Sequence, residues 1–509
     1  MGDAYNATVD LLERNRATPD RPAFRQDGRV TTYGALCDRA NRAGSALLRL
    51  GMEIEQRVLL CMLDTPDLAA VFWGAMKAGL VPVPVNTLLT TADYDYLLRD
   101  SRARVLVVSA ALLPKLEPIL RGQPFLTAVV VAGERAPGYL ALDDLLADAS
   151  ATLEAAPTRC DDVAFWLYSS GSTGQPKGAM HLHGDLVETA QLYGQGVLGI
   201  RSDDLVFSAA KLFFAYGLGN AMTFPFSVGA CSALLADRPT PQSVARLLRE
   251  ERPTLFFGVP TLFAAILADS GASDLGGRLR FCVSAGEPLP RDIGVRWRER
   301  YGVDILDGIG STEMLHIFLS LRPGDIRYGT TGKPVPGYEI QIVDEQDRPV
   351  PRGEIGELRV SGPSSAIAYW NNREKSVRAF RGRWTYTGDK YQQDADGYFV
   401  YCGRSDDMIK ASGQWVSPAE VEAALVAHPS VLEAAVVAHQ DENHLDKPKA
   451  FVVLKPGARA SADELQRFVK ERLAPFKYPR WVEFLDSLPK TATGKIQRFK
   501  LRQIHSPGG

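Results

Sequence analysis

Cysteine is scarce in this sequence, and no two cysteines form a C-x-x-C pair. The six cysteines are Cys37, Cys61, Cys160, Cys231, Cys282 and Cys402. Zinc sites and disulfide frameworks both depend on cysteines at characteristic spacings. The scattered positions argue against both kinds of site and favour a reduced compartment.

An excess of charge of either sign is also lacking. The formal net charge of the 509 residues is −2 and the isoelectric point is about 6.4, whereas proteins that bind nucleic acid or anionic lipid usually carry a basic patch. The N-terminus has no basic segment followed by an apolar run, so no signal peptide is visible. We therefore expect a cytoplasmic protein whose partners include neither nucleic acid nor a membrane.

One uncharged run, Leu212–Ala236, is long enough to cross a bilayer. Gly217, Pro225 and Gly229 are among the residues that interrupt it, and its apolar positions follow no continuous helical stripe. We expect this run to lie in the protein interior and to line a pocket.

The sequence does contain a loop suited to phosphate, Tyr168–Gly178, after the strand-like run Val163–Tyr168. Its glycines let backbone N–H groups converge on an anion, its hydroxyl groups add donors, and Lys177 adds a positive charge. The ordinary P-loop is excluded, because Pro176 precedes the lysine and Gly178 follows it. A flexible linker is the alternative, but linkers rarely follow a buried strand or contain Pro-Lys-Gly.

Strand-like and helix-like runs alternate on both sides of this loop. The strand-like runs are Arg57–Met62, Arg104–Val108, Ala128–Val131, Thr254–Val259, Leu279–Ser284 and Val303–Leu306. Together with helix-like runs such as Pro66–Gly79, they predict α/β layers with parallel strands. Parallel sheets bind ligands at the carboxyl ends of their strands. Ser284–Pro288 and Asp307–Glu313 each follow such a strand on a loop and are candidate binding segments.

The pattern of apolar, glycine and proline residues changes twice in the second half of the sequence. Short alternating runs between glycines and prolines at about 330–403 predict an antiparallel, β-rich subdomain. Further on, Ser417–Glu420 and Ser461–Glu464 each predict a helix start with a capping box. Strand-like runs at Glu433–Val437 and Ala450–Leu454 lie between these helices.

We therefore predict an α/β protein of two domains. Residues 1–403 would form a large N-terminal domain of layered α/β subdomains plus the β-rich subdomain, and residues 404–509 a small α+β C-terminal domain.

Three further groups of residues are candidates for chemistry. Glu313 could hold Mg²⁺, which prefers carboxylate and phosphate oxygens, although Gly310–Glu313 could equally be a helix N-cap. Asp389 and Arg404 supply a carboxylate and a guanidinium, and an aspartate suits the two hydroxyls of a ribose. Either one alone could be a turn aspartate or a surface arginine.

Pro489–Arg498 carries a second lysine loop. It is not a P-loop, because Pro489 replaces the leading glycine and Ile496 follows Lys495. A solvated basic tail is the alternative.

These segments resemble those of the acyl-adenylate-forming superfamily, which includes acyl- and aryl-CoA ligases, luciferases and the adenylation domains of peptide synthetases. The matching segments, in the same order and at about the same spacing, are Tyr168–Gly178, Gly310–Glu313, Tyr386–Asp389, Gly403–Asp407 and Pro489–Arg498. The resemblance covers essentially the whole chain. It implies an enzyme that uses ATP and Mg²⁺ to adenylate a carboxylic acid.

The resemblance also implies roles for single residues. Lys177 would hold the β- and γ-phosphates, Glu313 would bind Mg²⁺, and Asp389 with Arg404 would hold the ribose. The other residues implied in binding the nucleotide or coenzyme A are Ser169, Ser170, Gly171, Ser172, Thr173, Gly174, Gly286, Glu287, Pro288, Asp307, Gly308, Thr312 and Gly413.

Lys495 is the residue to which the resemblance assigns the first chemical step. It would stabilise charge as the carboxylate attacks the α-phosphate and pyrophosphate leaves. Asp406 matches the hinge about which the mobile C-terminal domain rotates, which would withdraw Lys495 and bring the 410–417 loop, with Gly413, to the pantetheine tunnel. The context of Lys495 also resembles sites that acetylation silences, so we expect a lysine acetyltransferase and a deacetylase as partners. We expect a homodimer as well.

The segments Lys211–Gly217 and Met314–Ile317 resemble those of benzoate-CoA ligases and of their hydroxybenzoate- and aminobenzoate-activating relatives. The residues that would surround a flat aromatic acid are Phe214, Ala215, Tyr216, Gly217, Gly310, His316 and Ile317. Tyr216 stands where many relatives carry histidine, and His316 would form a hydrogen-bonding end wall. Plain core packing of these aromatic residues is the alternative.

The expected function is therefore that of an ATP- and Mg²⁺-dependent aryl-CoA ligase for benzoate or a simple substituted benzoate. The alternatives are another acid, such as furoate or a medium-chain fatty acid, and a carrier-protein thiol in place of coenzyme A. A non-catalytic nucleotide-binding protein is disfavoured, because a mere binder would not require Glu313 and Lys495.

Overall fold

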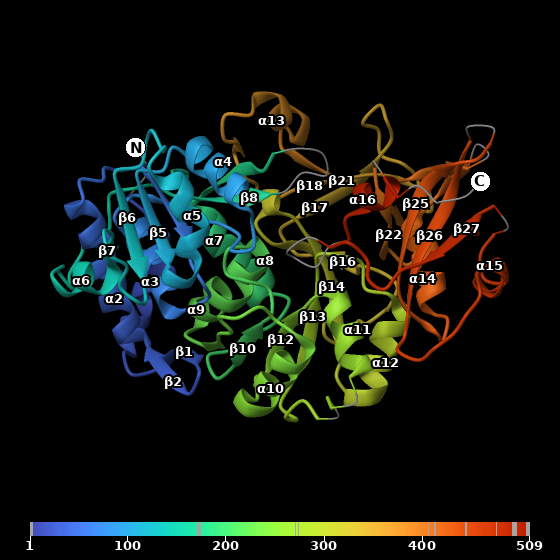
Figure 1. Ribbon diagram of the computed structural model, residues 1–509, viewed down its shortest axis with the longest axis horizontal. Helices are drawn as coiled ribbons and strands as arrows, with labels where there is room; N and C mark the ends of the chain where they lie inside the picture. Colours follow the sequence, from blue (N-terminus) through green and yellow to red (C-terminus); the bar gives the residue numbers. More distant parts are fainter. Residues whose placement is uncertain are drawn as a thin grey trace.

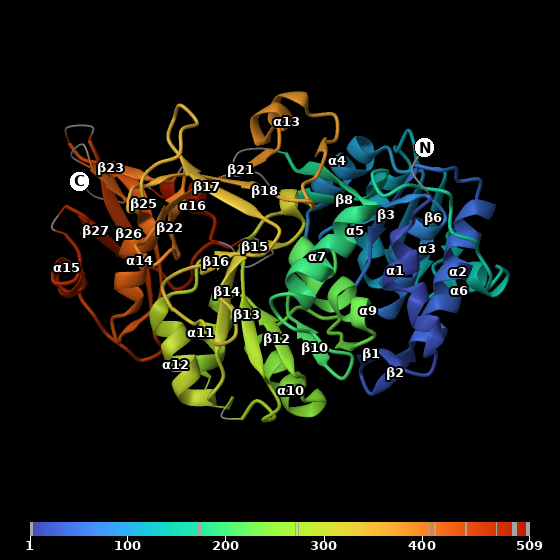
Figure 2. The ribbon, with the colours of Figure 1, turned by 180° about the vertical axis from the view of Figure 1, so that it is seen from behind.

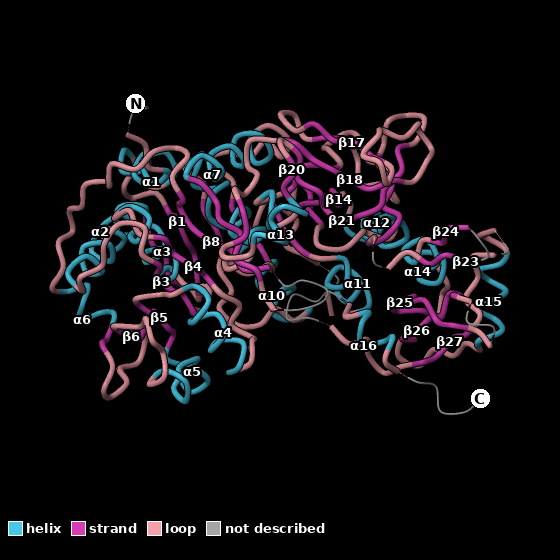
Figure 3. The backbone as a smooth tube through the Cα atoms, turned by 90° about the horizontal axis from the view of Figure 1, so that it is seen from above, coloured by secondary structure: helices cyan, strands magenta, loops and turns pink. Residues whose placement is uncertain are grey.

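The computed structural model describes residues 4–169, 175–269, 271–272, 274–405, 407–411, 414–442, 445–474, 476–490 and 496–504, with the backbone alone for 410, 411, 414 and 415. Figures 1 and 2 show the molecule from opposite sides, with a layered sheet of the N-terminal part at one end and the C-terminal elements at the other. The view from above agrees with this arrangement (Figure 3).

The sheet at the N-terminal end has five parallel strands in the order β4-β3-β5-β6-β7. The strands are β3 (Arg57–Cys61), β4 (Val81–Pro84), β5 (Val105–Ser109), β6 (Ala128–Ala132) and β7 (Leu140–Ala141), and the helices are α2 (Tyr33–Arg49), α3 (Pro66–Lys77), α4 (Thr91–Ser101), α5 (Leu113–Leu120) and α6 (Leu142–Ala147). Strands β3 to β5 are almost wholly buried, as expected of parallel strands covered on both faces.

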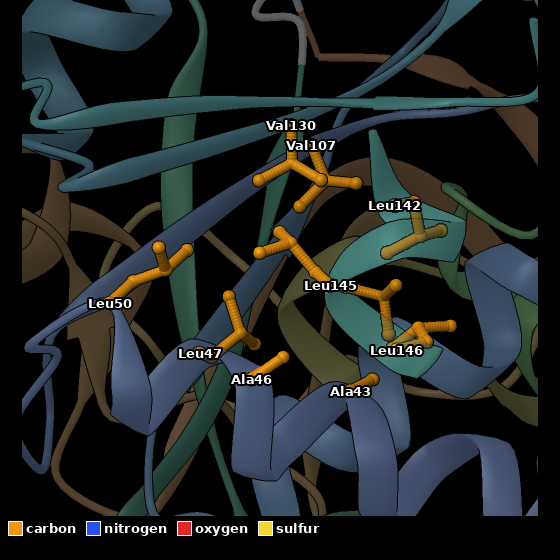
Figure 4. Close-up of a pocket in the computed structure, with 10 residues that line it drawn as sticks. Ala43, Ala46, Leu47, Leu50, Val107, Val130, Leu142, Leu145 and Leu146 are labelled. Carbon is orange, nitrogen blue, oxygen red and sulfur yellow. The ribbon is translucent and has the colours of Figure 1, made fainter. Parts of the chain in front are cut away.

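Helices α2 and α6 pack under this sheet around a layer of apolar side chains (Figure 4). Alanine and leucine side chains of α2 face leucines of α6 beneath Val107 and Val130 of the sheet. The cavity that remains between them is about 10 Å³. That is too small for a ligand, so this layer serves as core.

A second, nine-stranded sheet forms the middle of the molecule, in the order β16-β15-β14-β13-β12-β10-β11-β1-β2. Its strands are β1 (Pro22–Gln26), β2 (Arg29–Thr32), β10 (Leu205–Ser208), β11 (Cys231–Ala233), β12 (Leu255–Gly258), β13 (Phe281–Ser284), β14 (Ile305–Gly310), β15 (Ile317–Ser320) and β16 (Lys333–Pro334). Pairing is parallel from β1 through β14, and β2, β15 and β16 are antiparallel. Helices α10 (Pro241–Glu251), α11 (Pro260–Ala268) and α12 (Arg291–Tyr301) connect its strands.

One prediction about this sheet is wrong. We expected Asp307–Gly310 on a loop, but these residues continue β14 and pair with β15. Glycine and aspartate are poor strand formers, which is why the segment resembles a loop. The glycines allow close approach instead: a Cβ on Gly310 would lie 2.5 Å from the His316 carbonyl oxygen, and one on Gly308 would lie 3.0 Å from Ile317.

A small antiparallel sheet, in the order β19-β9-β8, carries the ends of the glycine loop. Its strands are β8 (Val163–Ser169), β9 (Lys177–Leu182) and β19 (Ala368–Tyr369). The strand expected before the loop is confirmed. Because the loop joins two antiparallel strands and no helix follows it directly, the structure agrees with the exclusion of a P-loop.

The uncharged run Leu212–Ala236 is interior, as predicted. It forms three consecutive short helices, α8 (Ala215–Leu218), the π-helical η4 (Gly219–Thr223) and α9 (Phe224–Val228), before β11. Residues 217 to 227 are all buried. No helix in the described part of the chain is long and apolar enough to cross a membrane.

The β-rich part is an antiparallel sheet of five strands, as predicted. They are β17 (Glu339–Val343), β18 (Gly356–Ser361), β20 (Phe380–Arg381), β21 (Trp384–Gln393) and β22 (Phe399–Arg404), with α13 (Arg373–Ala379) beside them. Strand β22 ends at Arg404, so the boundary expected between 403 and 404 stays a prediction.

The C-terminal part contains the sheet β25-β26-β27 and three helices. The strands are β25 (Val431–Gln440), β26 (Asp446–Leu454) and β27 (Trp481–Phe484), the helices are α14 (Pro418–Val426), α15 (Ala462–Lys470) and α16 (Arg498–Arg502), and the hairpin β23 (Ile409–Ala411) with β24 (Gln414–Val416) precedes them. The capping box predicted at Ser461 is confirmed.

The capping box predicted at Ser417–Glu420 is only half confirmed, because one of its two hydrogen bonds is not made. Ser417 caps α14 by accepting from the Glu420 N–H, but the Glu420 carboxylate does not return to the cap. It accepts hydrogen bonds from Lys477 Nζ at 2.7 and 2.8 Å instead. A charged partner from a distant segment outcompetes the local N–H, because a charge-assisted bond is the stronger one.

A buried histidine gives the fold a dependence on pH. His183 begins α7 (His183–Thr189), and its Nδ1 accepts a hydrogen bond from the Ala7 N–H at 3.2 Å. Burial lowers the pKa of His183 from 6.5 to about 4. Between these values the unfolded chain binds a proton that the folded protein does not, so stability falls as the pH falls.

We expect this histidine to cost the wild type about 3 kcal/mol of unfolding free energy between pH 8 and pH 4. The His183→Gln variant keeps an acceptor but does not titrate, so its stability should fall less over that range. Urea unfolding followed by tryptophan fluorescence measures the difference. Equal acid sensitivity of the two proteins would contradict the expectation.

Candidate active site

Glu313 is the centre of a polar cluster at the end of β14. It lies in the one-turn helix η5 (Thr312–Met314), and the Ser311 side chain caps this helix. The predicted N-cap is therefore present, and it leaves the Glu313 carboxylate available for a functional role. Its Oε1 accepts hydrogen bonds from the hydroxyls of Tyr369 at 2.6 Å and Ser169 at 3.4 Å. Lys177 Nζ stands 3.9 Å from the same oxygen and 3.2 Å from the Tyr369 hydroxyl.

Glu313 and Lys177 form a half-buried ion pair. Burial raises the pKa of Glu313. The hydrogen bond from Tyr369 and the charge of Lys177 lower the pKa by more than burial raises it, so the pKa lies below its usual value. Burial lowers the pKa of Lys177, and Glu313 opposes that shift. The Lys177 ammonium also lies 4.2 Å from the centroid of the Tyr369 ring, a cation–π contact. An ionised carboxylate and a cation side by side suit a ligand that brings both phosphate oxygens and a metal ion.

The sequence reasoning missed the residues that hold Glu313 in place. His181, fully buried in β9, lies with Nε2 2.7 Å from the Thr312 carbonyl oxygen and Nδ1 2.8 Å from Asp185 Oδ2. Both ring nitrogens therefore have a hydrogen-bond partner, which fixes the orientation of the ring. The spacing of His181 and Asp185 by four residues was a usable signal. Tyr369 offered none, because it lies nearly two hundred residues beyond Lys177.

Asp389 and Arg404 are brought together on neighbouring strands. They face each other in the register of β21 and β22, with Arg404 Nη1 3.0 Å from Asp389 Oδ1 and 2.9 Å from the Thr387 carbonyl oxygen. A Cβ on Gly388, whose φ is +72°, would lie 2.9 Å from Arg404 Nη2, so this approach requires glycine. The structure therefore brings the carboxylate and the guanidinium together, and their role in holding a ribose stays a prediction.

Asp307 is a buried acid on β14. Burial raises its pKa well above the usual value, and hydrogen bonds from the Leu289 and Gly308 N–H groups offset this only in part. Its Oδ1 has no hydrogen-bond partner among the described residues. A buried polar atom of this kind fits a site that a polar ligand completes.

The loop of Gly286, Glu287 and Pro288, between β13 and α12, meets the C-terminal part of the chain. Glu287 Oε1 accepts a hydrogen bond from the Ile496 N–H at 3.0 Å. Ile496 directly follows Lys495 in the sequence. The described backbone next to Lys495 therefore lies against the candidate nucleotide site.

Some of the predicted residues lie outside the described part of the chain. They are Ser170, Gly171, Ser172, Thr173 and Gly174 of the glycine loop, Asp406, Gly413 and Lys495. Their roles stay predictions.

An aromatic cluster lies beyond Glu313. The Tyr216 hydroxyl donates to the carbonyl oxygens of Val283 at 3.0 Å and Gly258 at 3.3 Å, at the ends of β13 and β12. His316 is 3% exposed, and its ring centroid lies 5.6 Å from that of Tyr216 and 4.4 Å from that of Phe224.

The other residues predicted for the acid pocket surround this cluster. Phe214 and Ala215 are half-buried at the start of α8. Gly217 allows a tight turn, because a Cβ there would lie 2.0 Å from the Lys211 carbonyl oxygen. Gly310 and Ile317 lie on the paired strands β14 and β15. The residues predicted from two separate segments are therefore brought to one place.

Comparison with known proteins now identifies the family. The model of the AMP-binding enzyme family matches residues 11–370, and that of the AMP-binding enzyme C-terminal domain matches residues 420–495. The chain belongs to the AMP-binding enzyme family. The predicted membership of the acyl-adenylate-forming superfamily is confirmed.

Several members of the AMP-binding family are similar over their whole length. A benzoate–CoA ligase of Thauera aromatica is 57% identical, with 98% of this chain and 96% of the relative covered. A 4-hydroxybenzoate–CoA/benzoate–CoA ligase of Rhodopseudomonas palustris is 50% identical, with 98% and 94% covered.

Solved structures of AMP-binding enzymes have the same fold as this chain over almost its whole length. The anthranilate CoA ligase AuaEII, in complex with anthranoyl-AMP, has a TM-score of 0.96 at 46% identity, with 99% of this chain and 98% of that one covered. A benzoate CoA ligase from Burkholderia xenovorans LB400 has a TM-score of 0.92 at 52% identity, with 98% and 100% covered. The predicted fold, a large N-terminal α/β domain followed by a small C-terminal one, is confirmed.

Proposed function

We propose that this protein is an ATP-dependent aryl-CoA ligase that acts on benzoate or a simple substituted benzoate. In the first step a carboxylate oxygen of the acid attacks the α-phosphorus of ATP, and the bond to pyrophosphate breaks. In the second step the thiol of coenzyme A displaces AMP and forms the thioester. The observation that carries the proposal is the Glu313–Lys177 ion pair beside the aromatic cluster of Tyr216 and His316, and the aryl-CoA ligases among the relatives support it.

Three sets of groups would hold the nucleotide, at its phosphates, at its ribose and at the α-phosphorus. Lys177 and the hydroxyl of Ser169 face the phosphates, and the Asp389–Arg404 pair binds the ribose. Lys495, next to the contact between Ile496 and Glu287, stabilises the charge that develops during attack on phosphorus.

Magnesium would bind at Glu313. The described residues contain no cluster of three or more histidine, cysteine, aspartate or glutamate side chains that could hold a metal. A single ionised carboxylate fits Mg²⁺ nevertheless, because this ion is commonly bound by one or two carboxylates, the phosphates of the substrate and water. When bound, the metal would neutralise charge on the phosphate oxygens.

The second step requires the C-terminal part to move. The hydrogen bond between Glu287 and Ile496 joins the residue after Lys495 to the N-terminal part, which supports the proposal that this contact belongs to the adenylation step. We propose that rotation about Asp406, between the domains 1–403 and 404–509, breaks this contact and brings Gly413 to the coenzyme A site.

The aromatic acid is tested by exchange of labelled pyrophosphate into ATP without coenzyme A. We expect exchange that depends on benzoate or a close analogue, and subsequent thioester formation on addition of coenzyme A. Exchange that only furoate or a medium-chain fatty acid supports would overturn the assignment of benzoate as the acid. Transfer to a carrier-protein thiol but not to coenzyme A would overturn the second step.

Three further properties belong to this proposal. The protein would be cytoplasmic and would form a homodimer. Acetylation of Lys495 by a lysine acetyltransferase would remove the charge that adenylation needs, and a deacetylase would restore it.

A further inference from the structure

A polar pocket lies at the edge of the nine-stranded sheet opposite the candidate active site. Three neighbouring parallel strands, β1, β11 and β10, begin at this pocket, whereas Glu313 follows the carboxyl end of β14 in the same sheet. In Figures 1 and 2, β1 and β10 lie close together at the lower edge of the molecule. Parallel strands begin at one edge of a sheet and end at the other, so this pocket is separate from the groups around Glu313.

Three arginines from separate places in the sequence line the pocket. Arg21 precedes β1, Arg25 lies within it, and Arg278 precedes β13. The pocket has a volume of about 180 Å³, far more than the roughly 10–15 Å³ that one water molecule needs. A solute of several non-hydrogen atoms therefore fits there.

The two aspartates that line the pocket are paired with arginines outside it. Asp203 Oδ1 lies 3.3 Å from Arg201 Nε, and Asp204 Oδ2 lies 2.7 Å from Arg280 Nη2. Neither Arg201 nor Arg280 lines the pocket. The negative charges of the lining are therefore compensated from outside, and they leave the lining arginines largely unpaired.

The partners of the three lining arginines confirm this excess of positive charge. Arg25 Nη1 lies 3.6 Å from Glu251 Oε2, which is longer than a hydrogen bond. Arg21 donates to the Ser202 carbonyl oxygen, a neutral acceptor. Arg278 is exposed and forms no ion pair within the described part of the chain. Planar guanidinium groups bind oxyanions through paired N–H donors, so this lining favours an anion.

We propose that this pocket binds a small oxyanion of the phosphate class through Arg21, Arg25 and Arg278. Phosphate matches better than a monocarboxylate, because at least two guanidinium charges lack an ionic partner and phosphate brings up to two negative charges. The inference goes beyond the proposed function and does not depend on it, since no lining residue belongs to the candidate active site.

Cys231, which begins β11 and lines the same pocket, reports whether the pocket is occupied. Burial raises the pKa of its thiol to about 11, and the charge of Arg25 opposes this shift. The thiol therefore reacts slowly at pH 7 and faster at pH 9, because the thiolate is the nucleophile. A bound anion would cover the thiol and slow its modification further.

Alkylation by iodoacetamide at pH 9 tests the proposal on the full chain, with the peptide that contains Cys231 quantified by mass spectrometry. Inorganic phosphate should slow alkylation of Cys231 severalfold and leave the exposed Cys160 unaffected. Sodium chloride at the same ionic strength should not protect Cys231, because it supplies screening without a matching oxyanion. Equal protection by chloride and phosphate would overturn the proposal.

Two variants connect the protection to the arginines. Arg278→Gln removes an exposed guanidinium, and Arg21→Gln removes one that also contacts Ser202. Each should raise the half-protecting concentration of phosphate about tenfold, the worth of one charge-assisted hydrogen bond. Arg246→Gln removes the same charge from an exposed position of α10 that does not line the pocket, and it should protect like wild type. Unchanged protection in both lining variants would overturn the proposal.

Pyrophosphate, a product of the proposed adenylation step, is the second probe. Protection at lower concentrations of pyrophosphate than of phosphate would identify the reaction product as the ligand, and the reverse order would identify free phosphate. Absence of protection by both anions would overturn the proposal. Failure of every aromatic acid to support pyrophosphate exchange would overturn the proposed function instead, and it would leave the protection of Cys231 intact.

Discussion

Replacement of Lys495 by alanine is expected to slow adenylate formation about a thousandfold, the loss seen when a preorganised charge-stabilising group is removed. The positive charge is needed only while the carboxylate attacks phosphorus and pyrophosphate leaves. Thioester formation from supplied benzoyl-AMP and coenzyme A should therefore continue at the wild-type rate. Pyrophosphate exchange measures the first step, and release of AMP measures the second.

A matched control lies in the same segment. Lys490 carries the same charge, but its Nζ is paired with Glu433 Oε1 at 2.6 Å, so Lys490→Ala should retain exchange. Equal loss of both steps in Lys495→Ala would refute a role confined to adenylation.

A second test is Asp406→Pro, which should retain pyrophosphate exchange and lose thioester formation if Asp406 is the hinge.

Replacement of Glu313 by glutamine is the change with the second-largest expected effect. Glutamine keeps the size of the side chain and can still accept from the Tyr369 hydroxyl, but it removes the negative charge beside Lys177. If Glu313 holds Mg²⁺ against the phosphates, pyrophosphate exchange should fall roughly a hundredfold or more. The Mg²⁺ concentration needed for half-maximal exchange should rise at the same time.

The control for this change is Tyr369→Phe. It removes the hydrogen bond to Glu313 and leaves the carboxylate, so its loss of activity should be much smaller, with little change in the requirement for Mg²⁺. If Glu313→Gln exchanges as well as wild type at low Mg²⁺, the carboxylate is not the metal ligand.

The comparison of sequence and structure shows where local reasoning fails. Asp307–Gly310 has the composition of a loop, yet it is a strand because β15 pairs with it and the glycines allow the contact. Glu420 has the position of a capping residue, yet Lys477 binds its carboxylate. In both places a partner distant in sequence outweighed the local preference.

The class of fold, the order of the predicted binding segments and the family could all be inferred from the amino-acid sequence alone. These properties follow from short-range patterns: apolar runs that alternate with helical ones, a glycine loop ending in Lys177, and an acid on the strand end at Glu313. Such patterns fit within a few neighbouring residues, so they can be read without knowledge of the folded chain.

The groups that surround the active side chains could be found only in the folded protein. Tyr369 donates a hydrogen bond to Glu313, His181 contacts the Thr312 carbonyl oxygen, and Asn220 Oδ1 lies 3.1 Å from His316 Nε2. No local pattern predicts these contacts, because they join residues that lie 56, 131 and 96 positions apart in the sequence. The contact between His316 and Gly219 depends as well on the space that a missing Cβ leaves. That packing also lowers the pKa of His316 to about 3, because burial disfavours the charged form of the ring.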